Sequence, residues 1–263
     1  MRPIMSEREL EVGWELAQST GPVPLGVSMD GFRDRAAVGR AMRVFARPAV
    51  TVVIQFGDRP LTSEGVVRRS ASDGLVAGLL PGIRHVHSER VECVELRMSP
   101  ITAYRLLDAA PTDLDGTLIG LDDIWGSAAP LLRERLSESA TWADRFAVTT
   151  KFLVAQESSR TADPEVVACW DRIVTDKGAV RVRELAELTG WSRKRVWSRF
   201  TAQVGVTPKR AAMVVRFRSA FELLLTGRTI AEAAVTCGYS DQSHLHRDMS
   251  TFAGVTPGAL AAT

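Results

Sequence analysis

The chain has 263 residues, of which 45% are hydrophobic and 24% are charged, so a long disordered protein is excluded. It has no run near the ~18 apolar residues that a membrane span needs, and its first ten residues carry charges where a signal peptide has an apolar core. Three cysteines, Cys93, Cys169 and Cys237, lie far apart and indicate neither a disulfide framework nor a thiolate zinc site. We therefore expect a cytoplasmic globular protein.

The net charge of +2 hides an uneven distribution along the chain. Residues 1–164 contain 19 Lys and Arg against 22 Asp and Glu, whereas residues 165–263 contain 14 against 9. Residues 188–221 contain no acid at all. Eight cations lie in that window: Arg193, Lys194, Arg195, Arg199, Lys209, Arg210, Arg216 and Arg218. Such a cluster favours a polyanionic partner, and its alternative is a solvated basic surface.

Short apolar runs in the first half predict β-strands. The clearest is 49–56, which is rich in β-branched residues and is followed by the turn Gly57-Asp58. Three more runs follow at 75–80, 83–87 and 91–98. Strands this short, separated by turns, indicate a small antiparallel barrel or sandwich.

From Ser99 onward the periodicity becomes helical. Ser99 is a candidate helix cap before Pro100, and apolar spacings of three and four residues predict helices over 128–136 and 142–155, the second capped by Thr141. The polar stretch 158–164 is typical of a linker. The pattern thus predicts two domains, a β-rich domain at 1–160 with flanking helices and an all-α domain at 165–263.

The second domain contains only short helical patterns, divided by glycine turns. Helices are predicted over 165–175, 182–188, 193–203, 208–225, 230–236 and 241–252. Two segments, 184–200 and 229–252, share one pattern: a helix with an internal alanine, a turn containing Gly190 or Gly238, and a polar second helix. Each is followed by Gly-Val-Thr-Pro. We interpret them as a duplicated helix-turn-helix.

These motifs resemble the AraC/XylS family of transcription regulators. The matching segments are LAELTGWS at 185–192, RFTAQVGVTPK at 199–209, RFR at 216–218 and IAEAAVTCGYSDQSHL at 230–245. The resemblance implies an α+β protein whose second domain carries two helix-turn-helix units joined by the helix at 208–225. It also implies that two recognition helices enter neighbouring major grooves of double-stranded DNA, about 34 Å apart.

Helical spacing divides the residues of each recognition helix into core and surface. Val196 and Phe200 are expected inside the first unit, and Leu245, Met249 and Phe252 inside the second. The remaining side chains are candidates for base contacts, with a core position as the alternative for Trp197. Candidate DNA contacts are Arg193, Lys194, Trp197, Ser198, Arg199, Gln242, Ser243, His246 and Arg247. Lys209, Arg210, Arg216 and Arg218 are expected to hold phosphates or to bridge to neighbouring protein.

The first domain contains one arrangement that resembles a metal motif. His85 and His87 would share one face of a strand, with Glu92 as a third ligand, and this spacing is similar to the first metal motif of cupins, a fold that the family's sensor domains often have. A second histidine cluster is missing from the sequence, so we predict no metal. By resemblance this half senses an effector, and its candidate lining residues are Trp14, Phe32, Phe45, Phe56, His85 and His87.

The sequence thus predicts a transcription regulator and no enzyme, with no cofactor. Double-stranded DNA is the expected partner; RNA polymerase, a small-molecule effector and a second copy of the chain are candidate partners, and a membrane is not. The alternative is a cupin-like metal-dependent enzyme with a DNA-binding tail, and a third hypothesis is a protein that coats DNA without sequence preference. Hydrolase and nucleotide motifs such as G-x-S-x-G and the P-loop are absent from the sequence.

Overall fold

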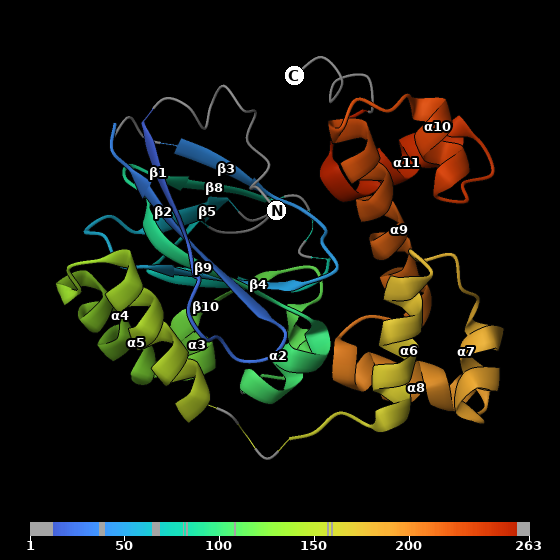
Figure 1. Ribbon diagram of the computed structural model, residues 1–263, viewed down its shortest axis with the longest axis horizontal. Helices are drawn as coiled ribbons and strands as arrows, with labels where there is room; N and C mark the ends of the chain where they lie inside the picture. The colour runs from blue at the N-terminus through green and yellow to red at the C-terminus, as the bar shows by residue number, and fades with distance from the viewer. Residues whose placement is uncertain are drawn as a thin grey trace.

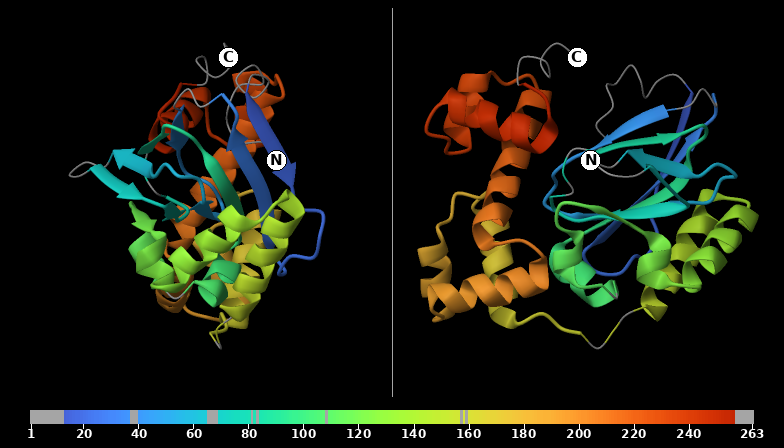
Figure 2. Two further views of the ribbon diagram at one scale, coloured as in Figure 1. Left: turned by 90° about the vertical axis from the view of Figure 1, so that its left-hand side faces the viewer. Right: turned by 180° about the vertical axis from the view of Figure 1, so that it is seen from behind.

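The computed structural model describes residues 13–36, 40–64, 69–80, 82, 84–107, 109–156, 158 and 160–256. A β-rich domain lies beside an all-α domain (Figures 1 and 2). The strands are β1 (Trp14–Gln18), β2 (Val27–Asp34), β3 (Arg40–Val44), β4 (Val50–Gln55), β5 (Leu61–Glu64), β6 (Arg69–Ser72), β7 (Gly74–Ala77), β8 (Arg84–Ser88), β9 (Glu92–Met98) and β10 (Leu118–Gly120). The α+β class expected from the sequence is confirmed.

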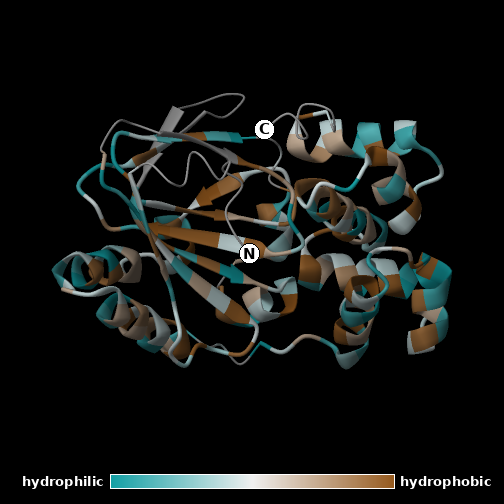
Figure 3. Cartoon of the chain, turned by 45° about the horizontal axis from the view of Figure 1, so that its top comes forward, coloured by the Kyte–Doolittle hydropathy of each residue, from teal (hydrophilic) through white to brown (hydrophobic). Residues whose placement is uncertain are grey.

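The strands form two antiparallel sheets. The larger sheet has the order β1-β2-β9-β4-β7-β10, and the smaller has the order β3-β8-β5-β6. Apolar side chains of both sheets meet in a cluster of Leu61, Leu75 and Val86, so the sheets face each other. The opposite side of the large sheet is covered by helices, among them α3 (Leu121–Trp125), α4 (Ala128–Glu138) and α5 (Trp142–Ala155). Hydrophobic residues accordingly concentrate on the strands and on the helix faces turned to them (Figure 3).

The predicted local signals of the first domain correspond to real elements. The expected strands at 49–56, 75–80, 83–87 and 91–98 match β4, β7, β8 and β9, although β7 ends at Ala77. Ser99 caps α2 (Pro100–Leu106), where its side chain accepts a hydrogen bond from the Thr102 N–H. Thr141 and Asp144 form a capping box at the start of α5. The sequence did not predict strands β1, β2, β3, β5, β6 and β10.

The second domain consists of six helices among the described residues. They are α6 (Pro164–Thr175), α7 (Val182–Thr189), α8 (Arg193–Val204), α9 (Pro208–Leu225), α10 (Ile230–Thr236) and α11 (Gln242–Ala253). Their bounds lie within two residues of those expected. The units α7–α8 and α10–α11 lie at opposite ends of α9 (Figure 1). At about 1.5 Å per residue, the 18 residues of α9 span about 27 Å.

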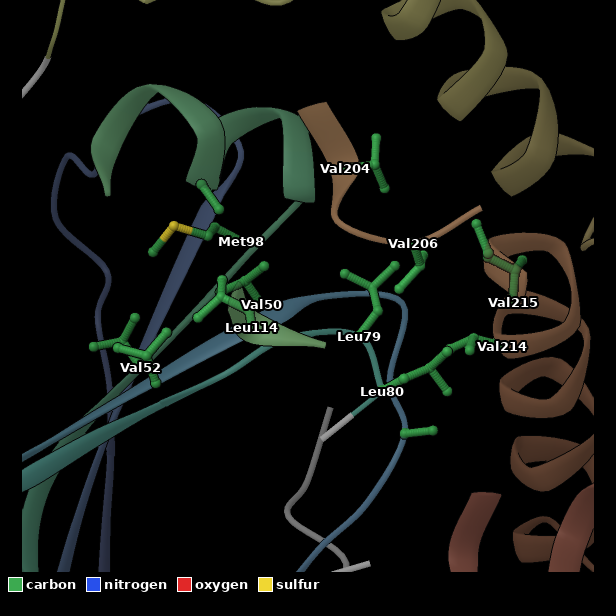
Figure 4. Close-up of a cluster of buried hydrophobic side chains, with 14 of the residues drawn as sticks. Val50, Val52, Leu79, Leu80, Met98, Leu114, Val204, Val206, Val214 and Val215 are labelled. Carbon is green, nitrogen blue, oxygen red and sulfur yellow. The ribbon is translucent and has the colours of Figure 1, made fainter. Parts of the chain in front are cut away.

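One apolar core runs through both domains. Helix α9 is buried on nearly every side, because both helix-turn-helix units and the β-rich domain pack around it. Figure 4 shows the junction, where Leu79 and Leu80 of the first domain lie beside Val206 and Val214 of the second. Phe45 adds an aromatic contact, with its ring 5.5 Å from that of Phe221 on α9. The two domains are therefore packed together.

Candidate nucleic-acid interface

In the first helix-turn-helix unit, the second helix, α8, has one buried face and one polar face that is open to solvent. Gly190, at φ 68°, ends α7 in the left-handed conformation that favours glycine, and the Ser192 side chain then accepts from the Arg195 N–H to start α8. Val196 and Phe200 are buried as expected. The other side of α8 is open to solvent: Arg193, Lys194, Trp197, Ser198 and Arg199 are all exposed.

Trp197 is 54% exposed, which excludes the core position left open by the sequence. It lies one helical turn after Lys194 and next to Ser198 on α8. A large aromatic side chain that the surrounding protein leaves uncovered is suited to contact with a second molecule.

The second unit repeats this arrangement with different chemistry. The Asp241 Oδ1 accepts from the His244 N–H at 2.7 Å to start α11. Leu245, Met249 and Phe252 are buried as expected. Gln242, Ser243 and Arg247 are exposed, whereas His246 is half-buried.

Residues 188–221, which contain no acid, form ion pairs with carboxylates outside this segment. Each of four arginines pairs with one acid. Arg199 pairs with Asp163 at 2.7 Å, Arg210 with Asp115 at 2.6 Å, Arg216 with Asp248 at 3.6 Å and Arg218 with Glu222 at 2.9 Å. Arg199, Arg210 and Arg216 thus bridge to neighbouring elements, which is the alternative that the sequence left open for Arg210 and Arg216, whereas Arg218 pairs within α9.

Other cations of the window remain accessible. Arg193, Lys194 and Lys209 are exposed and form no ion pair with any residue that the structure describes. Arg195 stacks over the Trp191 ring at 4.4 Å. Arg193 and Lys194 lie in the first turn of α8, and Lys209 lies at the start of α9. The unpaired positive charge is therefore found where α8 and α9 begin.

The β-rich domain touches the ends of both recognition helices. The 3-10 helix η1 (Pro111–Leu114) packs on α8, and a Cβ added at Gly205, after the end of α8, would lie 2.3 Å from the Pro111 carbonyl oxygen. At the other unit, the Ala46 N–H donates to the Phe252 carbonyl at 3.1 Å. The exposed side chains of Arg193, Lys194, Trp197, Gln242 and Ser243 stay uncovered, so this contact does not block them.

A cluster of charged side chains lies at the domain junction. Asp30, Glu95 and Arg97 share one face of the large sheet, where Arg97 pairs with Asp30 and also approaches Glu95 at 3.6 Å. Burial raises the pKa of Glu95, and burial together with the nearby Arg47 charge lowers the pKa of Arg218 on α9. Buried charge of this kind is costly to stability and often marks a functional site.

An open groove adjoins this cluster. Its volume is about 610 Å³, and its lining includes Gln18, Ser28, Asp30, Arg97 and Ser99. The walls thus combine one acid, one base and several groups that can donate or accept hydrogen bonds. The lining also includes apolar side chains such as Val23, Met29 and Met98, so it suits a small molecule with both polar and apolar parts.

The six residues expected to line an effector pocket do not surround one space. Trp14 and Phe32 belong to a small cluster with Val91 and Cys93, whereas Phe45 packs on α9. Phe56 packs edge-on against Trp142, 5.9 Å away. His85 and His87 flank the buried Val86 on β8, so they point out of the small sheet, with His85 exposed and His87 half-buried. The positions of these residues in the sequence do not show that their side chains lie at four separate places in the fold.

The structure also separates the residues of the metal-like motif. Glu92 pairs with Arg33 and Arg90, each at 3.2 Å, and not with the outward histidines of β8. In the described part of the chain, no group of three or more His, Cys, Asp or Glu is arranged to hold a metal ion. The ligand set that the enzyme alternative requires is therefore not assembled by these residues.

Comparison with known proteins finds a helix-turn-helix domain in the carboxy-terminal part of this chain. Residues 185–263 match the family model described as a helix-turn-helix domain. The chain is 41% identical over 66 residues to an uncharacterized HTH-type transcriptional regulator, YbfI of Bacillus subtilis strain 168; that match covers 25% of this chain and 24% of the relative. It thus spans about a quarter of the relative's length.

Solved structures share the two-domain fold. ToxT from Vibrio cholerae O395 superposes with a TM-score of 0.50 at 11% identity, covering 90% of this chain and 97% of that chain. ToxT bound to (E)-4-(8-methylnaphthalen-1-yl)but-3-enoic acid gives a TM-score of 0.50 at 12% identity, covering 85% and 97%. No helix among the residues described here has the length and apolar character needed to cross a membrane.

Proposed function

We propose that this protein is a transcription regulator that binds specific sequences of double-stranded DNA. The observation that carries the proposal is the pair of capped, solvent-exposed recognition helices at the two ends of α9. A connector of about 27 Å, with a recognition helix beyond each end, is compatible with two major grooves one turn, or about 34 Å, apart. The proposal includes no catalytic step.

We propose roles for side chains of the two recognition helices and of the start of α9. Arg193 and Lys194 pair with guanine edges, and Trp197 packs on a thymine methyl group or a sugar. Gln242 pairs with adenine, and Arg247 with guanine or a phosphate. Lys209 holds a phosphate, which gives affinity without sequence information. Ser198, Ser243 and His246 complete the two contact faces.

Selection of bound sequences from random duplex DNA by the full-length protein tests this proposal. Two short boxes about one helical turn apart are expected, and two such pairs would indicate a homodimer. Absence of enrichment together with a steep salt dependence would instead support the DNA-coating hypothesis. Binding of no duplex at low salt would overturn the proposal.

We further propose that a small acidic effector binds in the groove beside Asp30 and Arg97. Support comes from the buried charges there and from the position of Arg97 near Arg218 of α9, which puts the groove at the domain junction. The similar ToxT fold was solved with a bound carboxylic acid. An effector controls DNA binding only if it prefers one arrangement of the domains.

A thermal-shift screen of carboxylic acids with the full-length protein tests the effector proposal. A bound acid should raise the melting temperature of the wild type and of Arg84→Gln, but not of Arg97→Gln. Arg84 is a suitable control because its guanidinium bonds the Gly116 carbonyl, and Arg84 does not line the groove. A hit that stabilises Arg97→Gln as strongly as the wild type would contradict this placement.

A further inference from the structure

The segment between the two domains is held firmly to α2. Ser158 bonds the Arg105 carbonyl twice, through its N–H at 3.1 Å and its hydroxyl at 2.8 Å. Arg160 donates to the carbonyls of Leu107 and Ala109, and its guanidinium lies 4.4 Å from the centre of the Tyr104 ring. This polar stretch, which the sequence suggested was a linker, is therefore attached to the β-rich domain.

The same segment ends on the first recognition helix. Both oxygens of the Asp163 carboxylate accept from the Arg199 guanidinium, at 2.7 and 2.8 Å. The Asp163 N–H donates to the Gln203 Oε1 at 2.8 Å, and Gln203 is only 3% exposed. Hydrogen bonds from Arg199 hold the pKa of Asp163 below its usual range. Arg199 and Gln203, which lie one turn apart on α8, thus both hydrogen-bond to Asp163.

A bidentate pair fixes the direction of both partners. A guanidinium and a carboxylate joined by two parallel hydrogen bonds are held in one plane, which a lysine cannot reproduce. Arg199 therefore points toward the interdomain segment, whereas Lys194 and Ser198 lie about 100° or more away around the helix. The guanidinium of Arg199 already has the acceptor that a DNA phosphate would otherwise supply.

The second unit has a charged residue at the equivalent position. With Ser192 aligned to Asp241 and Gly205 to Gly254, Arg199 corresponds to Asp248. Asp248 pairs with Arg216 of α9 at 3.6 Å. The sign of the charge is reversed, yet in each unit this position ties the recognition helix to a neighbouring element. A DNA contact would not favour an acid at this position.

We propose that Asp163 positions the first recognition helix through Arg199 and Gln203, so that Arg199 supports DNA binding without touching DNA. Because the segment before Asp163 is attached to α2, a displacement of the β-rich domain is passed directly to α8. Arg199 and Gln203 are positioning residues in this scheme. The inference rests on the proposed DNA-binding function and assigns part of its regulation.

Salt dependence separates a positioning residue from a phosphate contact. Arg199→Gln and Asp163→Asn should each weaken binding of the selected duplex about tenfold, since each breaks the same charged hydrogen bonds. Neither should change the slope of log K against log salt. The control Lys209→Gln should reduce the magnitude of that slope by about 0.9, the value for one lost phosphate contact.

A charge swap provides the stricter test. The double variant Asp163→Arg with Arg199→Asp re-forms the ion pair with reversed charges and should recover at least half of the lost affinity on a logarithmic scale. A slope reduced by about 0.9 in Arg199→Gln, with unchanged affinity in Asp163→Asn, would overturn the inference. So would a swapped variant that binds no better than the single variants.

Hydrogen exchange distinguishes failure of this inference from failure of the proposed function. Asp163→Asn should speed amide exchange in α8 and leave α11 unchanged, whether or not DNA is present. If the wild type binds no DNA, the DNA-binding proposal fails while this measurement still reports on the attachment of α8. Equal exchange in α8 of the wild type and of Asp163→Asn would contradict the positioning role.

Discussion

The two helix-turn-helix units have the same arrangement of caps and buried positions but differ in charge. Caps, buried positions and terminal glycines occupy equivalent places, as with Ser192 and Asp241. Helix α8 carries four cations, whereas α11 carries Arg247 and two histidines. The same fold therefore presents a strongly basic face in one unit and a nearly neutral one in the other. We expect the first unit to contribute more affinity and the second to contribute mainly sequence preference.

The units also differ in how they are attached to the β-rich domain. Helix α8 packs on η1 and α2, Asp115 joins the β-rich domain to Arg210 at the start of α9, and Asp163 of the interdomain segment pairs with Arg199 of α8. The second unit meets that domain at Phe252, where the Ala46 N–H donates a hydrogen bond. The first unit should therefore move with the β-rich domain, while α9 largely sets the place of the second.

Equivalent substitutions in the two recognition helices test the difference in affinity. Lys194→Ala should weaken binding of the selected duplex about 10- to 100-fold, because a base contact by a cation is worth about 1–3 kcal/mol. Ser243→Ala at the equivalent position should cost about two- to tenfold, the value of one neutral hydrogen bond. Fluorescence anisotropy at fixed salt measures both. Equal losses would contradict the proposed division between the units.

Two glycines of the first unit test its attachment to the β-rich domain. Gly190→Ala should lower the free energy of unfolding by about 1–2 kcal/mol, the cost of left-handed backbone for alanine, because nothing lies within 4 Å of the added Cβ. Gly205→Ala should cost about 1–3 kcal/mol more, since its Cβ would collide with the Pro111 carbonyl oxygen. Urea unfolding provides the comparison. If the two variants lost equal free energy of unfolding, η1 would move away from the added Cβ without an energetic cost.

The all-α domain could be predicted well because its signals are local. A cap such as Ser192 and a turn glycine such as Gly190 act within a few residues of their own position, so sequence spacing is enough to locate them. The ion pairs could not be predicted in this way. Asp115 lies 95 residues before Arg210, and only the folded chain brings the two together.

The β-rich domain was harder to predict because charged residues occupy the inner face of a sheet. Strand β2 contains Asp30 at a position that faces Glu95 across the pair, so its alternation of apolar and polar residues is disturbed. The aromatic residues proposed as a pocket pack at separate places. Hydrophobicity alone therefore gave no signal for the groove beside Arg97.

The caps of α8 and α11 provide the prediction with the smallest expected effect, and it is confined to the first turn of each helix. Asp241 caps α11 with a carboxylate, and the hydrogen bond from the His244 N–H lowers its pKa. A lowered folded-state pKa means that this stabilisation is present above the unfolded value of about 3.9 and is lost as the pH falls through the folded-state value. Ser192, which caps α8, does not titrate in this range. Lowering the pH from 5 to 3 should therefore reduce the protection factors, which are exchange rates corrected for the intrinsic rate at each pH, in the first turn of α11 more than in that of α8. Asp241→Asn, which keeps a capping oxygen without its charge, should remove this difference, and a difference that persists in the variant would assign it to another group.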